Sequence, residues 1–234
     1  MTKRDTRFNE PLYTVAEAAR VVGVPSLTLA TWTKGYVRDR LDQGAVIGEA
    51  VVTAFVAVGP SPSIPFIGLA EALVLAAMRQ SGVPMQRVRP VVAVLQRHIG
   101  IAHALASRQL CTDGAEILYG FSADTVDADV VSSLVVGRNG QRVFLDAVRE
   151  QLDRIEFGPD GYANLVHVSG YRGSVVCDPL RSFGRPIFVH GGTRVDDVIA
   201  RFQSGDSIEE LTEEFGVSLI DIEDALRVAS RRAA

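Results

Sequence analysis

Six polar or basic side chains near the N-terminus have the types and spacing expected of a DNA-contacting surface. On a helix placed in the major groove, hydroxyl and amino groups reach base edges, while Lys and Arg pair with phosphates. We predict a recognition helix over residues 26–34 that presents Ser26, Thr28, Thr31 and Lys34 to the groove. The basic side chains predicted to lie beside phosphates are Lys34, Arg38 and Arg40. The alternative is a small helical module that packs for structural reasons.

Two short helices must position these side chains. The segment over residues 13–36 reads YTVAEAARVVGVPSLTLATWTKGY. Thr14 followed by Glu17 is a capping box that predicts a helix start, and Gly23 predicts its end. The second helix has apolar positions at Leu27, Leu29 and Trp32, and Trp32 is predicted to lie in the core because it shares a face with Leu29. Two short helices about a glycine turn indicate a helix-turn-helix.

Enzymatic chemistry has little support in this sequence. Its four histidines are His98, His103, His167 and His190, which we interpret as surface or interface residues. His98 and His103 are five residues apart, which separates them by about 140° on a helix, so they cannot face one metal ion. The HGG at 190–192 lacks an accompanying GxSxG motif, and we interpret it as a loop that uses glycine backbone angles. Cys111 and Cys177 form no disulfide framework. We expect no catalytic residue, no metal and no cofactor.

Charge divides the chain into two halves. Residues 1–110 hold 12 Lys and Arg against 7 Asp and Glu, whereas residues 111–234 hold 12 against 21. The N-terminal half can therefore meet a polyanion that the C-terminal half repels. Residues 206–224 form a second helix-turn-helix pattern with eight acidic residues and no Lys or Arg. We expect this module to bind protein rather than DNA; the alternative is a solvated acidic face.

Composition bounds the class of protein. The 234 residues are 47 % hydrophobic and 22 % charged, enough to bury a core. The most apolar stretch, Leu69–Met78, is too short for a membrane-spanning helix and contains Glu71. The polar N-terminal segment does not have the pattern of a signal peptide. We expect a soluble, cytoplasmic protein with no membrane partner.

The predicted fold class is α+β and mainly α. Four regions are expected: a flexible tail over 1–11, a helix-turn-helix plus helical pair over 12–110, a small β-containing middle region with a hairpin over 111–180, and a three-helix, helix-turn-helix-like domain over 181–234. Predicted helices cover 68–81, 84–99 with a stripe through Val88 and Val92, 141–152, Thr193 to Gln203, Ser207 to Gly216 and 218–230. Extended segments are predicted at 46–58, 117–121, 134–136, 155–157 and 165–168, with a hairpin turn at 158–161.

Three segments together resemble a known family. YTVAEAARVVGVPSLTLATW resembles the first helices of MerR-like DNA-binding domains, and FIGLAEALVLAAMRQSGVPMQRVRPVVAVL resembles the helical segment that follows them in a family of bacterial antitoxins. DPLRSFGRPIFVHGGTRVDDVIARFQSGDSIEELTEEFGVSLIDIEDALRVA is similar to their small C-terminal domain, long catalogued as of unknown function. The resemblance covers roughly residues 12–110 and 178–230, and it points to VapB-type antitoxins of actinobacteria, including mycobacteria.

This resemblance implies a two-gene toxin–antitoxin module. The partner would be a VapC-like ribonuclease with a PIN-type fold and an acidic metal site, encoded by a neighbouring gene. The two proteins together would repress their shared promoter. The family pattern usually has Arg after the Thr-Leu of the second helix, and that position is Ala30 here. One operator contact is therefore missing, and toxin binding is the firmer expectation.

Inhibition of such a toxin could use arginine. A guanidinium placed against clustered carboxylates can replace the cation that they hold, whereas the alternative is simple occlusion of the cleft. The candidate toxin-binding residues are Arg181, Arg185 and Arg194. Helix-turn-helix proteins commonly pair to match two half-sites, so we also expect a homodimer. The alternative function is a stand-alone transcription regulator whose middle region senses a small ligand.

Overall fold

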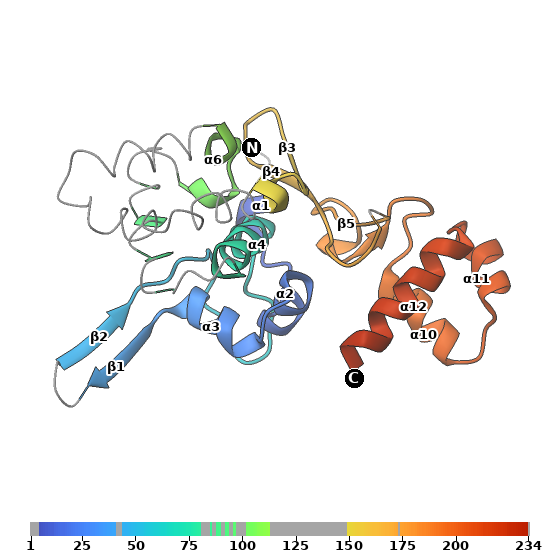
Figure 1. The fold of residues 1–234 in the computed structure, drawn as a ribbon, viewed down its shortest axis with the longest axis horizontal. Helices are drawn as coiled ribbons and strands as arrows, with labels where there is room; N and C mark the ends of the chain where they lie inside the picture. Colours follow the sequence, from blue (N-terminus) through green and yellow to red (C-terminus); the bar gives the residue numbers. More distant parts are fainter. Residues whose placement is uncertain are drawn as a thin grey trace, which may run out of the picture. The chain divides into compact units, whose positions relative to one another are not determined.

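The computed structural model describes residues 5–40, 44–80, 85, 88–89, 92–93, 96, 102–112, 149–172 and 174–233. The chain divides into two compact units, residues 1–163 and 164–234. Figure 1 draws the chain from its N-terminus in blue to its C-terminus in red. The class is α+β and mainly α, as predicted, since the described residues are mostly helical and also form two small sheets.

Short helices begin the N-terminal unit. They are α1 (Thr6–Asn9), α2 (Val15–Val22) and α3 (Ser26–Lys34). The predicted capping box of α2 is confirmed, because the Thr14 hydroxyl accepts the Glu17 N–H at 3.2 Å and the Glu17 carboxylate accepts the Thr14 N–H at 2.9 Å. α2 ends at Gly23, whose φ of 77° is accessible to glycine without strain. α1 lies where the sequence predicts a flexible tail, and Arg7 ion-pairs it to Asp160.

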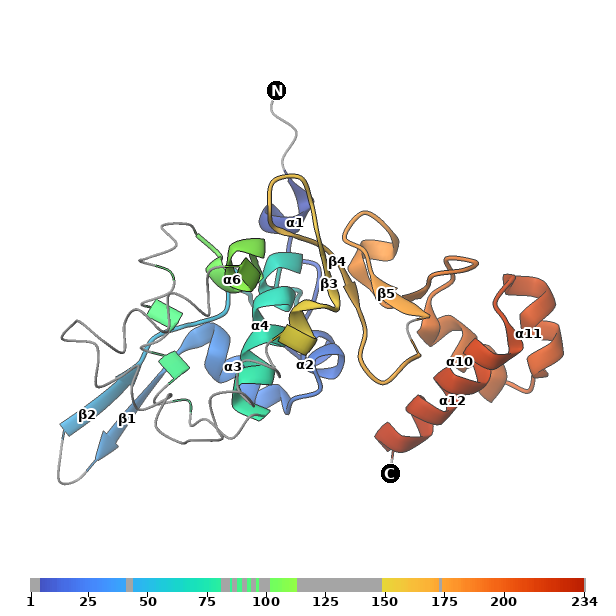
Figure 2. The same ribbon diagram turned by 45° about the horizontal axis from the view of Figure 1, so that its top comes forward.

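A β-hairpin follows α3. Strand β1 (Tyr36–Arg40) pairs antiparallel with β2 (Gly44–Gly48), and the hairpin projects away from the helices in Figures 1 and 2. Of the extended segment predicted at 46–58, residues up to Gly48 form strand β2, whereas residues 49–58 form no strand. Instead, the N–H groups of Val51 and Val52 donate to the Trp32 carbonyl at 2.8 and 3.1 Å. The chain after the hairpin is thereby tied to α3.

The central helix of this unit is α4 (Phe66–Gln80), and nearly all of its residues are buried. It confirms the apolar helix predicted at 68–81 and contacts α1, α2 and the 3-10 helix η1 (Ala104–Ala106). A short helix, α6 (Arg108–Thr112), follows η1. Val88 and Val92 of the next predicted helix are helical and buried, whereas Leu95 and Ile99 lie outside the described residues. Within the described ranges, no helix is long and apolar enough to cross a membrane.

Four short strands form a sheet in the order β3 (Ile155–Phe157), β4 (Ala163–His167), β5 (Val175–Cys177) and β6 (Ile187–Phe188). The predicted turn at 158–161 is confirmed by a 2.8 Å bond from the Gly158 N–H to the Tyr162 carbonyl. Strand β6 lies in a region predicted to be helical. The strands predicted at 117–121 and 134–136 lie outside the described residues, as does most of the helix predicted at 141–152.

The C-terminal unit contains α10 (Val195–Gln203), α11 (Ile208–Phe215) and α12 (Leu219–Ala233), which lie together in Figure 2. One residue of each helix (Val198, Leu211 and Ile222) is fully buried, so the three helices share a core. The helix predicted from Ser207 is confirmed, and it begins with a capping box between Ser207 and Glu210. The helix predicted to begin at Thr193 instead has Arg194 at its N-cap, and no side chain caps it, because arginine has no acceptor oxygen.

Candidate functional site

Helix α3 carries four of the six predicted DNA-contacting residues. Ser26 and Lys34, at its two ends, are exposed. Thr28 and Thr31 are half-buried and already hydrogen-bonded, because the Thr31 hydroxyl donates to the Leu27 carbonyl at 2.9 Å and Thr28 Oγ1 accepts from Arg79 at 3.4 Å. The other two, Arg38 and Arg40, lie in β1, and their side chains are outside the described part of the chain. Of the described set, Ser26 and Lys34 are the most accessible to a ligand.

The outward face of α3 also presents an apolar side chain. Leu27 is 80 % exposed, whereas Leu29 and Trp32, the other apolar positions of the helix, are buried. Helical periodicity explains the difference, since Leu29 and Trp32 are three residues apart on the core face and Leu27 lies two residues before Leu29. An exposed leucine at the start of a recognition helix can contact a thymine methyl group in the major groove.

Two arginines that sequence reasoning missed contact α3 from other segments. Arg79, in the last turn of α4, donates to Thr28. Arg89 donates to the Thr31 carbonyl at 3.3 Å, its guanidinium lies 5.1 Å from the Tyr36 ring centre, and burial lowers its pKa. Both side chains add positive charge beside α3. The excess of basic residues over 1–110 was the signal that could have identified them.

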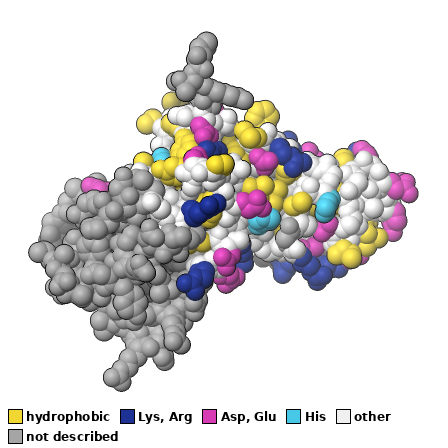
Figure 3. Space-filling model, turned by 90° about the horizontal axis from the view of Figure 1, so that it is seen from above, with side chains coloured by type: hydrophobic (Ala, Val, Ile, Leu, Met, Phe, Trp, Pro, Cys, Tyr) yellow, Lys and Arg dark blue, Asp and Glu magenta, His cyan; other side chains and the backbone are white. Residues whose placement is uncertain are grey.

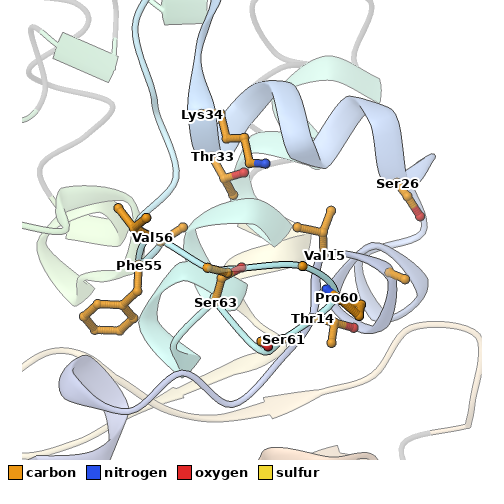
Figure 4. A pocket seen from close by; sticks show the side chains of 14 residues that line it. Thr14, Val15, Ser26, Thr33, Lys34, Phe55, Val56, Pro60, Ser61 and Ser63 are labelled. Carbon is orange, nitrogen blue, oxygen red and sulfur yellow. The ribbon is translucent and has the colours of Figure 1, made fainter.

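A pocket of about 660 Å³ lies beside α3. Figure 4 shows its wall: Ser26, Thr33 and Lys34 come from α3, residues 14–16 come from the start of α2, and the rest come from residues 54–63. Val56 and Val58, in that last segment, are among the most exposed apolar side chains of the unit. The pocket therefore combines hydroxyl groups, one amino group and apolar surface next to the candidate recognition helix.

A buried polar cluster holds α4 against the chain that follows the hairpin. Glu71 of α4 is 2 % exposed, and its carboxylate accepts the Thr53 N–H at 2.6 Å and the Thr53 hydroxyl at 3.1 Å. His103 Nδ1 lies 2.9 Å from Glu71 Oε1, so this histidine, predicted to be a surface or interface residue, is half-buried and contacts the Glu71 network. The Trp32 carbonyl of α3 accepts hydrogen bonds from residues 51 and 52, and Glu71 of α4 binds Thr53. The chain over residues 51–53 therefore connects α3 to α4.

The three predicted toxin-binding arginines lie around one loop region of the C-terminal unit. Arg181 is exposed, and its guanidinium lies against the backbone of Gly192. Arg194 is half-buried and ion-pairs with Asp197 at 3.3 Å. Arg185 is half-buried, directly before β6. The loops over 178–185 and 190–194 are therefore neighbours. The prediction that the HGG segment uses backbone angles favoured by glycine is confirmed, because Gly191 and Gly192 have positive φ of 79° and 69°.

Helix α11 is strongly acidic. Its acidic residues are Glu209, Glu210, Glu213 and Glu214, and Figure 3 shows where Asp and Glu side chains lie on one face of the described surface. Arg201 of α10 binds Glu214 through two bonds of 2.9 and 2.8 Å and also pairs with Asp206. Hydrogen bonding to Glu214 raises the pKa of Arg201. Arg201 thus neutralises part of the negative charge on a surface that would repel DNA.

Two family models match the chain. Residues 11–92 match a family described as "Putative DNA-binding HTH domain". Residues 175–229 match a family described as "Protein of unknown function (DUF433)". The first match contains α2, α3, the hairpin and α4, and the second contains β5, β6 and the three C-terminal helices.

Relatives from Mycobacterium tuberculosis match over nearly the whole chain. The protein named putative antitoxin VapB45 is 42 % identical over 228 residues, which are 95 % of this chain and 95 % of that protein. Uncharacterized protein Rv2308 is 29 % identical over 235 residues, with 94 % and 90 % covered. The crystal structure of Rv2018 superposes with a TM-score of 0.77 at 40 % identity, covering 94 % of this chain and 99 % of that one. The chain belongs to the family of VapB-type antitoxins that includes VapB45.

Proposed function

We propose that this chain is the antitoxin of a type II toxin–antitoxin module. The observation that carries the proposal is the full-length match to putative antitoxin VapB45, which includes both the helix-turn-helix and the C-terminal unit. The partner we propose is a VapC-like PIN-type ribonuclease encoded beside it. In this account the chain has no catalytic activity of its own and acts by binding. Expression of the neighbouring gene should arrest growth and cleave RNA, and co-expression of this chain should reverse both effects.

The proposed inhibitory contact uses the arginines around the loops at 178–185 and 190–194. A ribonuclease that holds a divalent cation with several carboxylates offers a concentrated negative site once the cation is displaced. Guanidinium groups pair with carboxylates through two parallel hydrogen bonds. Arg181 is the most accessible of the three, whereas Arg194 already pairs with Asp197 and would have to exchange partners. Arg181 is therefore the first arginine expected to reach the toxin.

Charge reversal tests this contact. We expect the triple variant Arg181→Glu, Arg185→Glu, Arg194→Glu to require at least about 30-fold more antitoxin for half-inhibition of RNA cleavage, because each reversal turns attraction into repulsion. The matched control is Arg149→Glu, Arg154→Glu, Arg231→Glu, which changes net charge equally elsewhere. Unchanged inhibition by the triple variant would refute the arginine mechanism and leave occlusion of the cleft.

We also propose that the N-terminal unit binds the promoter of its own operon. Support comes from the helix-turn-helix geometry, the exposed face of α3 and the match to a DNA-binding helix-turn-helix family. Few cations are available in one chain, and phosphate contacts provide most of the affinity of such proteins. A homodimer that meets two half-sites doubles these contacts.

Lys34→Glu should weaken binding to the promoter and reduce its salt dependence. Each lost phosphate contact lowers the slope of log K against log salt by about one unit. Fluorescence anisotropy at several salt concentrations measures both quantities. Arg231→Glu, which makes the same charge change in the C-terminal unit, is the control and should leave the slope unchanged. Equal slopes for wild type and Lys34→Glu would remove Lys34 from the interface.

The pocket beside α3 favours a second candidate function, a transcription regulator that senses a small ligand. Its volume of about 660 Å³ lies in the range of small-molecule sites, and Lys34 is shared between pocket and helix. Ligand binding there would compete with DNA contact by Lys34. A metabolite that raises the melting temperature and alters promoter affinity without any protein partner would support this candidate over the antitoxin.

A further inference from the structure

The loop between β5 and β6 holds two large apolar side chains in solvent. Leu180 is 78 % exposed and Phe183 is 81 % exposed. Their neighbours are fixed, because Pro179 and Gly184 are buried and the Leu180 N–H donates to the Asp178 carboxylate at 2.9 Å. Exposed leucine and phenylalanine on an ordered loop have no benefit for folding of the unit, since folding favours burial of apolar surface.

The backbone of this loop is strained at the same residues. Ser182, Phe183 and Gly184 have φ of 47°, 55° and 74°, so they form one left-handed turn. The turn closes with hydrogen bonds from Gly184 to the Arg181 carbonyl at 2.9 Å and from Arg185 to the Ser182 carbonyl at 3.1 Å. Left-handed backbone is unfavourable for residues with a Cβ, and phenylalanine rarely adopts it. Such strain is typical of sites where a surrounding structure holds a side chain in place for function.

We propose that Leu180 and Phe183 are the apolar anchors of the partner-binding surface, inserted into an apolar pocket that Asp and Glu side chains border on the partner protein. The inference rests on the proposed antitoxin function and names the chemistry of its partner. Residues 178–185 contain two arginines and one acidic residue, Asp178, whose carboxylate accepts the Leu180 N–H, so the rim around the anchors has a net positive charge. Aromatic and arginine side chains are the types enriched at the core of protein interfaces.

The left-handed turn makes the loop a preformed binding element. A side chain that is already fixed in its bound position loses little conformational entropy on association, which raises affinity. Apolar anchors provide the attraction, and the arginines exclude partners whose pocket lacks acidic residues. This arrangement explains why strained backbone and exposed apolar surface occur together in residues 180–184.

The test measures binding of the protein encoded by the neighbouring gene to the full chain and two variants. We expect Leu180→Ser with Phe183→Ser to raise Kd at least ~30-fold, the effect of losing an interface hot spot. Phe183→Gly should weaken binding while it raises the melting temperature, because glycine relieves the strain. Phe183→Tyr keeps the ring and should bind like wild type. Ile220→Ser, which removes another exposed apolar side chain of the same unit, is the control.

The outcomes separate the inference from the function on which it rests. If wild type fails to bind the neighbouring protein, the antitoxin proposal fails and the inference fails with it. If wild type binds and the double serine variant binds within about threefold, the antitoxin proposal stands and the anchors are wrong. If the double serine variant binds weakly and also has a lower melting temperature, lost stability could explain the weaker binding. Phe183→Gly separates the two causes, because it removes the ring without destabilising the loop. Unchanged affinity of Phe183→Gly would therefore overturn the inference.

Discussion

Replacing Trp32 with alanine is expected to lower the free energy of unfolding of the N-terminal unit by about 3–5 kcal/mol. Trp32 is 1 % exposed, and its carbonyl accepts two hydrogen bonds from residues 51 and 52. Deletion of the indole leaves a cavity under α3 and loses the largest contact between that helix and the core. Since small domains are stable by only about 5–15 kcal/mol, α3 would lose much of its order at growth temperature.

Urea unfolding followed by circular dichroism measures this loss. The matched control lies on the same helix: Leu27→Ala removes an exposed leucine and should change stability by no more than about 0.5 kcal/mol. The two variants also separate stability from recognition, because Leu27→Ala should lower promoter affinity without destabilising the unit. A Trp32→Ala variant within 1 kcal/mol of wild type would contradict the core position of this residue.

Replacing Glu71 with alanine is expected to lower the free energy of unfolding by about 1–3 kcal/mol for each buried donor that is left without an acceptor. The Thr53 N–H would lose its acceptor inside the protein, and the Thr53 hydroxyl would be left with His103 Nδ1, 3.0 Å away, as its neighbour. Buried polar groups without partners are costly because water cannot replace the lost hydrogen bonds. The connection from α4 to the chain behind α3 would loosen.

The single tryptophan of the chain reports this change directly. Urea unfolding followed by Trp32 fluorescence should show a lower midpoint for Glu71→Ala and a smaller decrease for Glu71→Gln, whose amide oxygen still accepts one hydrogen bond. Glu10→Ala, an exposed acidic residue of the same unit, is the control. Equal midpoints for Glu71→Ala and Glu10→Ala would show that the cluster does not support α3.

Local signals made part of this fold predictable. The two capping boxes at Thr14 and Ser207 and the glycines after them fix helix ends through hydrogen bonds within four residues, and the structure confirms them. Leu29 and Trp32 are buried as their spacing predicts. These features depend on neighbouring residues, so the sequence contains the information needed to find them.

Some features lacked a clear sequence signal. The hairpin is local but was missed, because β1 has three charged residues in five and no apolar run to mark a strand. Residues 49–58 pair with no strand, and the N–H groups of Val51 and Val52 bond to Trp32 instead. Arg79 and Arg89 come to α3 from later segments, which no local pattern predicts. The left-handed turn was missed because only Gly184 signals it, while Ser182 and Phe183 belong to types that avoid positive φ.

The most direct test of the antitoxin account is purification of the tagged chain from its native host, with mass spectrometry of every protein recovered at equal stoichiometry. The account predicts recovery of a small nuclease encoded by the neighbouring gene, whose RNA cleavage is suppressed in the complex and returns when this chain is removed. Recovery of the chain by itself, from cells shown to express that neighbour, would contradict it.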